Sequence, residues 1–169
     1  GNQQLYSIDL QGGAPRKLFQ SLSIDTEPVY ASDGKTLYFV SDRSGGPQIY
    51  RATLPYGTPE RLTFTGAYNI SPAISPDGKL LAYITKSDGA YKLQLLDIAS
   101  KVVTSLTDTV ADERPSFSPN GRLIIYTTQE GGKDSLMMTT VDGRVKSKLA
   151  GQLGDMREDR KSTRLNSSH

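Results

Sequence analysis

The chain has 169 residues, of which 36% are hydrophobic, and it carries a formal net charge of +2. Arg160, Lys161 and Arg164, set against Asp159, account for that excess, so the rest of the chain is neutral and lacks the clustered cations that nucleic acid requires. Without cysteine, neither a disulfide nor a thiolate nucleophile can form. Because no apolar run approaches the roughly 20 residues of a membrane span, we expect no direct membrane insertion.

Short strands joined by tight turns are predicted from the N-terminus onward. The 16 glycines, 9 prolines and 9 tyrosines suit such a structure and disfavour long helices. Residues 1–20 form the end of a truncated unit, with a strand over Leu5–Leu10, a turn at Gln11-Gly12-Gly13 and a strand over Arg16–Phe19.

The next unit, residues 21–64, contains four predicted strands. Asp33-Gly34 between the first two is a tight turn, in which glycine adopts positive φ without a Cβ clash. The four strands cover Pro28–Ala31, Thr36–Ser41, Gln48–Thr53 and Glu60–Thr63. Together they predict an antiparallel meander.

This unit recurs along the chain at offsets of 44 and 43 residues. The segment PVYASDGK at 28–35 returns as PAISPDGK at 72–79 and as PSFSPNGR at 115–122. The repeat predicts further units at 65–107 and 108–151, followed by the start of a closing segment at 152–158. Residues 159–169 are polar and show no strand alternation, so we interpret them as a non-native tail.

A four-stranded meander repeated at about 40 to 45 residues is typical of β-propeller blades, whose sheets pack face to face around a central channel. The predicted fold is therefore all-β: an incomplete β-propeller of about 3.5 blades of four-stranded antiparallel sheet, built from WD40-like (PD40) repeats. Such a ring typically needs about four or more blades to protect its sheet faces from solvent. We expect the isolated chain to be marginally stable or prone to aggregation.

No catalytic residue, metal or cofactor is predicted. Several oxygen-bearing side chains in turns could approach calcium, but such residues usually bond the local backbone, and no D-x-D-x-D-G loop occurs. They are Asp33, Asp42, Asp77, Asp88 and Asn120. The only histidine, His169, lies in the tail, so no imidazole in the body of the chain can act as a general base.

Most aromatic residues are expected to pack between adjacent blades rather than to bind a carbohydrate or peptide, because they lie within predicted strands. This set is Tyr30, Tyr38, Phe39, Tyr83, Phe117 and Tyr126. Tyr68 differs, because it lies in a loop between blades.

Three polar clusters precede the innermost strands of the blades and should converge at one mouth of the channel. They are either solvated connecting loops or a surface for a partner protein, since propellers without an active site commonly bind partners across such a face. The clusters are Asp25-Thr26-Glu27, Tyr68-Asn69-Ile70-Ser71 and Asp112-Glu113-Arg114.

Several segments resemble the C-terminal propeller blades of the TolB family of the Tol-Pal system, over residues 1–158. They are SDRSGGPQIYR at 41–51, Thr26-Glu27-Pro28, Glu113-Arg114-Pro115 and DGRVKSKL at 142–149. Family members usually end with a proline and a short Trp-Ser-Pro strand after a segment like Met156-Arg157-Glu158. This chain departs from that pattern at Asp159, in line with a non-native tail.

The resemblance implies a periplasmic, non-enzymatic scaffold that binds the lipoprotein Pal through the propeller face. Its family role is to maintain the outer membrane and support its constriction in cell division, and it is also associated with protein import. TolA would be contacted only through an N-terminal region that this sequence lacks. The Pal contacts carried over from the family are Thr26, Glu27, Asn69, Asp112 and Glu113.

Two other readings of the sequence stay open. One is the propeller domain of a prolyl-oligopeptidase-like peptidase, whose catalytic Ser-His-Asp set would lie on a separate domain with a G-x-S-x-G motif. The other is a carbohydrate-binding surface propeller. The start of the chain, Gly1-Asn2-Gln3-Gln4, contains no signal peptide, so an exported protein would have lost it from this sequence.

Overall fold

A computed structural model describes residues 3–7, 14–19, 23–55 and 57–150. Every regular element in these ranges is a β-strand. The strands are β1 (Tyr6–Ser7), β2 (Arg16–Lys17), β3 (Asp25–Tyr30), β4 (Thr36–Ser41), β5 (Gln48–Thr53), β6 (Glu60–Arg61), β7 (Asn69–Ile74), β8 (Leu80–Ser87), β9 (Ala90–Asp97), β10 (Val103–Ser105), β11 (Asp112–Phe117), β12 (Leu123–Glu130), β13 (Lys133–Thr140) and β14 (Lys146–Ala150). No helix long and apolar enough to cross a membrane occurs in the described ranges.

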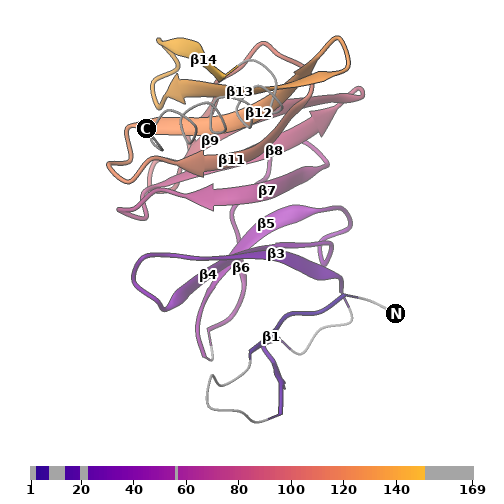
Figure 1. Ribbon diagram of the computed structural model, residues 1–169. Coiled ribbons are helices and arrows are strands. Elements are labelled where there is room, and N and C mark those ends of the chain that lie inside the picture. Colours follow the sequence, from indigo (N-terminus) through magenta and orange to yellow (C-terminus); the bar gives the residue numbers. More distant parts are fainter. Residues whose placement is uncertain (1–2, 8–13, 20–22, 56, 151–169) are drawn as a thin grey trace, which may run out of the picture.

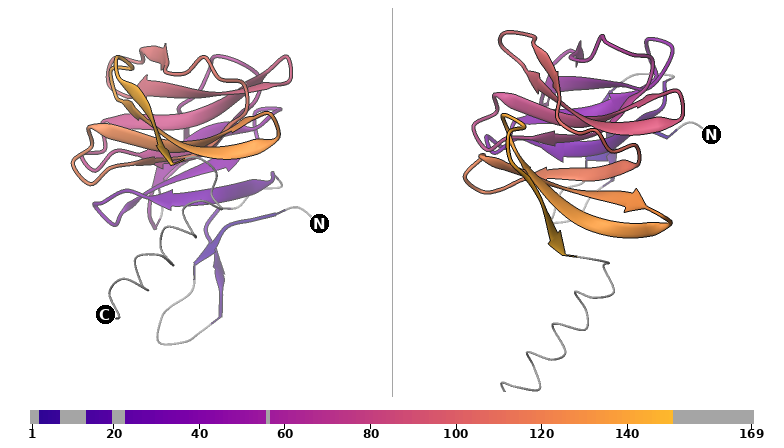
Figure 2. Two further views of the ribbon diagram at one scale, coloured as in Figure 1. Left: turned by 45° about the horizontal axis from the view of Figure 1, so that its top comes forward. Right: turned by 90° about the horizontal axis from the view of Figure 1, so that it is seen from above.

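The strands form three four-stranded antiparallel sheets and one two-stranded pair. The sheets run in the orders β3-β4-β5-β6, β7-β8-β9-β10 and β11-β12-β13-β14, and β1 pairs with β2. The first strands of the sheets form one side of the molecule, where β7 lies beside both β3 and β11 (Figure 1). Figure 2 shows the sheets following one another in a stack. The prediction of an all-β, incomplete propeller is confirmed.

The central strands of the first full blade lie where the sequence predicts them, and its edge strands do not. β4 and β5 have the predicted bounds, because both contain β-branched and aromatic residues that suit a strand, and most of their side chains are buried. The inner strand β3 begins at Asp25, three residues before the predicted start at Pro28, since a bulge lets the chain pair with β4 on both sides of the proline. The outer strand β6 ends at Arg61, although Leu62 donates one further backbone hydrogen bond to Ile49 at 2.8 Å.

In the truncated first unit, β1 begins at Tyr6, one residue after the predicted start, and β2 ends at Lys17, two residues before the predicted end at Phe19. The rest of the predicted strand over Leu5–Leu10 and the turn at 11–13 lie outside the described residues, as do the closing segment and the tail at 152–169.

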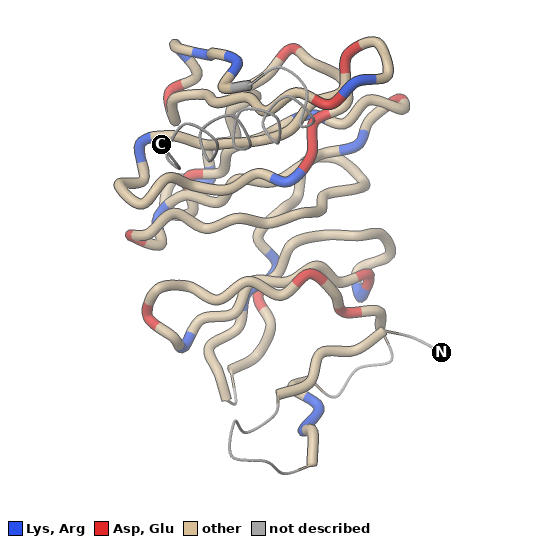
Figure 3. Tube along the Cα trace, in the orientation of Figure 1, with Lys and Arg blue, Asp and Glu red and all other residues tan. Residues whose placement is uncertain are grey.

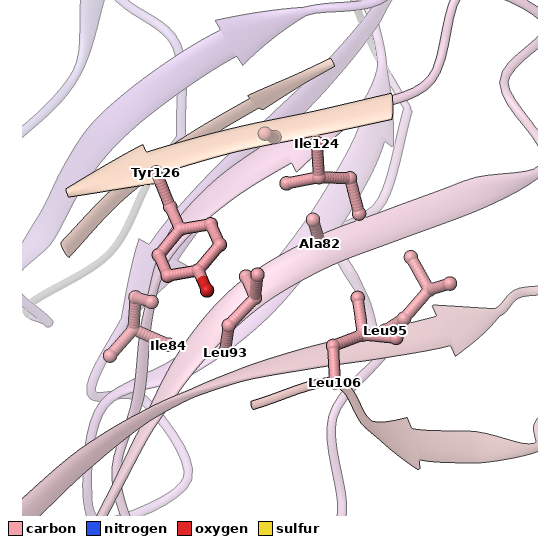
Figure 4. Packing of buried hydrophobic residues seen from close by; sticks show 8 residues of the cluster. Ala82, Ile84, Leu93, Leu95, Leu106, Ile124 and Tyr126 are labelled. Carbon is pink, nitrogen blue, oxygen red and sulfur yellow. The ribbon is translucent and has the colours of Figure 1, made fainter. Parts of the chain in front are cut away.

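Side chains from neighbouring sheets interlock to form the core. Along β4, Leu37 and Phe39 pack against the unit of β1 and β2, whereas Tyr38 and Val40 pack against the next blade. The same alternation continues in β8 and builds the following interface. Figure 4 shows Ile124 and Tyr126 of β12 together with the side chains they meet on the middle blade, which include Ala82, Ile84, Leu93, Leu95 and Leu106. Each boundary between sheets is thus a separate apolar layer.

Four of the aromatic residues expected in the core are buried: Tyr38, Phe39, Tyr83 and Tyr126. Burial raises the pKa of the Tyr83 and Tyr126 phenols to about 12, because the phenolate would be poorly solvated there. Phe117 is half-buried, and Tyr30 is 54% exposed, so the expectation was wrong for Tyr30. Tyr30 pairs in register with Leu37, on a face of β3 that no described inner strand covers.

Candidate partner-binding site

The three inner strands contain the same backbone irregularity at the same position. Glu27, Ser71 and Arg114 have φ values of 53°, 56° and 54°, and the strand register shifts at each of them. Each residue directly precedes a proline. A left-handed backbone is unfavourable for residues other than glycine, and residues before proline are normally extended. The bulge therefore recurs although the backbone is locally strained at each copy. In each blade, one residue of the inner strand has no paired residue on the neighbouring strand.

We call the end of the molecule at which β3, β7 and β11 begin the channel mouth, and the three bulges lie there. Glu27, Glu113 and Arg114 are exposed at this mouth, and Thr26 and Ser71 are half-buried. One carboxylate oxygen of Glu27 accepts a hydrogen bond of 2.9 Å from the backbone N–H of Ser71 on the next blade. The structure thus links a predicted site residue to the adjacent polar cluster.

Asn69 and Asp112, predicted as partner contacts, are fully buried at 0% exposure. The Asn69 amide nitrogen donates to Gln48 Oε1 at 2.9 Å and to the Thr65 carbonyl at 3.0 Å, although its Oδ1 has no partner among the described residues. Both partners of the amide nitrogen precede the middle blade in the chain. Asn69 therefore ties its inner strand to the preceding blade instead of facing solvent.

Asp112 makes the equivalent tie one blade later and is more completely bonded. Its carboxylate accepts from the backbone N–H of Leu93 at 3.1 Å, from the Thr128 hydroxyl at 2.9 Å, and from the hydroxyls of Thr107 and Thr109. A buried carboxylate needs such donors to offset its lost hydration. Like Asn69, Asp112 is buried and holds the start of its inner strand in place at the channel mouth.

Asp25 occupies the same position in the first blade and has a partner that the sequence analysis missed. The Arg43 guanidinium lies 2.9 Å from the Asp25 carboxylate and 5.1 to 5.6 Å from the ring centroids of Phe19, Phe39 and Tyr50. The sequence does contain a signal for this role, because Asp25, Asn69 and Asp112 recur at offsets of 44 and 43 residues. A polar residue that recurs at one position of a repeat points to a shared structural role.

In the turns at the end of the molecule opposite the channel mouth, aspartate carboxylates accept hydrogen bonds from nearby backbone N–H groups. Asp33 accepts from the backbone N–H groups of Lys35 and Thr36, at 2.7 and 2.8 Å. Hydrogen bonds to the charged form lower the pKa of the Asp33 carboxyl, with the Thr36 N–H the largest cause. Asp77, in the corresponding turn of the middle blade, and Asp142, in the β13–β14 turn, likewise accept from the N–H two residues on. There the largest causes of the lowered pKa are the hydroxyls of Ser75 and Thr140.

Two further observations bear on what the surface can bind. Within the described part of the chain, no group of three or more His, Cys, Asp or Glu side chains gathers as a metal site would require. Acidic and basic residues are interspersed along the trace (Figure 3). The described part of the chain therefore presents no extended surface field of one sign.

Three comparisons with known proteins agree with this geometry. A family model described as the TolB β-propeller domain matches residues 1–164. The TolB protein of Bordetella pertussis is 47% identical over 45 residues, which are 26% of this chain and 10% of that protein. The crystal structure of TolB from Acinetobacter baumannii superimposes with a TM-score of 0.80 at 41% identity, covering 90% of this chain and 39% of that one. This chain therefore spans well under half the length of these relatives.

A puromycin-hydrolysing peptidase from Mycobacterium tuberculosis also matches, with a TM-score of 0.65 at 21% identity over 85% of this chain and 23% of that one. At that identity the likeness extends to the propeller fold alone. The family model, by contrast, covers nearly the whole sequence. The chain belongs to the TolB β-propeller domain family.

Proposed function

We propose that this chain is part of a non-enzymatic periplasmic scaffold of the Tol-Pal system, which binds the lipoprotein Pal at the channel mouth. The observation that carries the proposal is the combination of TolB family membership with three bulged inner strands, which hold polar residues at one end of the blades. The scaffold acts by binding and release, and so supports outer-membrane integrity and constriction during cell division. TolA would be engaged by a part of the protein outside this chain.

Thr26, Glu27 and Glu113 are the proposed Pal contacts, because their side chains are wholly or partly accessible. Asn69 and Asp112 contribute indirectly, by fixing the strands on which these contacts lie. Polar groups at an interface give specificity mainly through the cost of leaving them unpaired with a wrong partner. The channel mouth would thus select a partner loop whose donors and acceptors match its own.

Calorimetric titration of Pal into a full-length TolB that carries these blades tests the proposal. We expect saturable binding, and we expect Glu113→Ala to weaken it by about tenfold, or about 1.4 kcal/mol. Glu130→Ala is the matched control, since Glu130 is an exposed glutamate of the same sheet that lies at the end of β12 rather than on the inner strand, and its side chain has no hydrogen-bond partner in the described structure. Absence of Pal binding by a cooperatively folded protein would overturn the proposal.

A further inference from the structure

The bulges at the channel mouth contain a carboxylate-binding arrangement that the chain itself demonstrates. Glu27 and Ser71 occupy equivalent positions, 44 residues apart, and the Glu27 carboxylate accepts from the Ser71 N–H at 2.9 Å across the blade boundary. The side chain of one bulge thus reaches the backbone N–H of the next. A bulge N–H in this fold is therefore a group that binds carboxylate.

The same arrangement is incomplete at the next boundary. Arg114 has the φ value and the place in the bulge that Ser71 has, so its N–H is expected to point the same way. The residue that should supply the acceptor is Ser71, whose side chain is shorter than that of glutamate. In the described ranges no side chain accepts from the Arg114 N–H, whereas the Ser71 N–H has its acceptor.

Two more donors at this boundary have no partner among the described residues. Arg114 is exposed, and its guanidinium forms no ion pair or hydrogen bond with any described residue. The Ser71 hydroxyl likewise has no partner in the part of the chain that the structure describes. Together, a backbone N–H, a hydroxyl and a guanidinium are an anion-binding set, and the planar guanidinium matches the two oxygens of a carboxylate.

Neighbouring acidic groups limit what can bind here. Asp112 is buried and its carboxylate already accepts four hydrogen bonds, so it is not free to fill the gap. Glu113 is exposed next to Arg114 and partly offsets its charge. A singly charged carboxylate therefore fits this position better than a multiply charged phosphate.

We propose that the gap between Ser71 and Arg114 binds a carboxylate supplied by the partner, an Asp or Glu side chain on an inserted loop. This carboxylate would take the place at the second boundary that the Glu27 carboxylate takes at the first. The identity of the partner rests on the proposed function, but the carboxylate site does not. Arg114 is then a direct contact at the second boundary, whereas one carboxylate oxygen of Glu27 closes the first boundary and the other has no partner among the described residues and remains accessible to the partner protein.

Amide NMR spectra of a full-length TolB that carries these blades test the site without any partner. Sodium acetate is the probe, and sodium chloride at equal ionic strength is the control. We expect acetate to shift the Arg114 amide proton downfield in a saturable way and to leave the Ser71 amide proton unchanged. An Arg114 amide that does not respond to acetate would overturn the proposal.

Two variants with opposite effects sharpen this test. Ser71→Glu should fill the gap from within and abolish the acetate response of Arg114, since the equivalent position already holds a glutamate at nearly the same φ. Glu27→Ala should open the first boundary, so that the Ser71 amide proton begins to respond to acetate. If Ser71→Glu fails to fold, the gain of response in Glu27→Ala still decides the question. A response of Arg114 that survives in folded Ser71→Glu would contradict the proposed geometry.

Pal titration then separates the site from its proposed partner. We expect Ser71→Glu and Arg114→Ala each to weaken Pal binding by about tenfold or more. Arg122→Ala is the control, because Arg122 is an exposed arginine of the same blade at the opposite end of β11. Unchanged Pal affinity in both variants would overturn the assignment of the carboxylate to Pal. A failure of the wild-type protein to bind Pal would instead refute the proposed function and leave the acetate result standing.

Discussion

The middle blade, β7 to β10, and the last blade, β11 to β14, have the same strand order but differ in how their central strands are covered. In β8, Leu81 and Tyr83 face one neighbouring sheet and Ala82 and Ile84 face the other, and all four are at most 2% exposed. In β12, every second residue from Leu123 to Thr128 is buried and the residues between are half-buried, while the last two residues are exposed. The contrast shows that burial in this fold depends on the neighbouring sheets as much as on the strand's own sequence.

The largest expected effect comes from removing equivalent side-chain volume from the two blades. Ile84→Ala should lower the free energy of unfolding of this chain by about 3 kcal/mol, because a fully buried isoleucine leaves a cavity. Ile125→Ala, at a half-buried position of β12, should cost about 1 kcal/mol. Urea unfolding followed by circular dichroism measures both values. Equal losses would contradict the difference in coverage between the blades.

A smaller effect is expected at the tie between these blades. Asp112→Ala should lower the free energy of unfolding by about 2 to 3 kcal/mol, because the Leu93 N–H and three threonine hydroxyls lose a charged acceptor. Thr128→Val, which removes one of those donors and keeps the shape, should cost less. Urea unfolding is again the measurement, and a neutral Asp112→Ala variant would show that this tie does not hold the last blade to the middle one.

The smallest effect concerns the hairpin turns, where the two blades should not differ. The pKa values of Asp77 and Asp142 are lowered from 3.8 in the folded state, so their contribution is present above about pH 4 and is lost as the pH falls through the folded pKa. Asp77→Asn and Asp142→Asn should each reduce the thermal midpoint at pH 7 and have little effect at pH 2.

The control for this comparison is already present in the chain. The first turn of the last blade has Asn120, whose Oδ1 accepts from the Arg122 N–H at 3.0 Å without titrating. Because these turns are local and exposed, the two Asp→Asn variants should lose similar amounts. A lower thermal midpoint in only one of the two variants would indicate that the stability of these turns depends on the neighbouring sheets.

The sequence predicted the parts of the fold that local patterns determine. Short runs with β-branched and aromatic residues between turn signals located β4 and β5, and the repeat predicted the blades. The start of β3 was missed because Pro28 normally marks the beginning of a strand. The bulge itself has no local signal, since Glu27, Ser71 and Arg114 share no residue type that favours positive φ.

The exposure of the candidate site residues was predicted only in part, because local patterns do not determine it fully. Thr26, Glu27 and Glu113 are accessible as expected, because residues before the inner strand reach the mouth. Asn69 and Asp112 were carried over as contacts from the family resemblance, but they are buried among hydrogen-bond partners that lie 3 to 21 residues away in the sequence. Only the folded chain brings those partners together.

The half-buried face of β12 also has a consequence for how the blades assemble. Because the blades follow one another along the chain, a blade that folds before the next one presents the face that β12 presents here until a further sheet packs against it. We expect a chaperone to crosslink through Ile125 to a chain shortened to end at this blade, and this crosslink to be lost when the next repeat follows. Each added blade would then shield its predecessor and become the exposed one in turn.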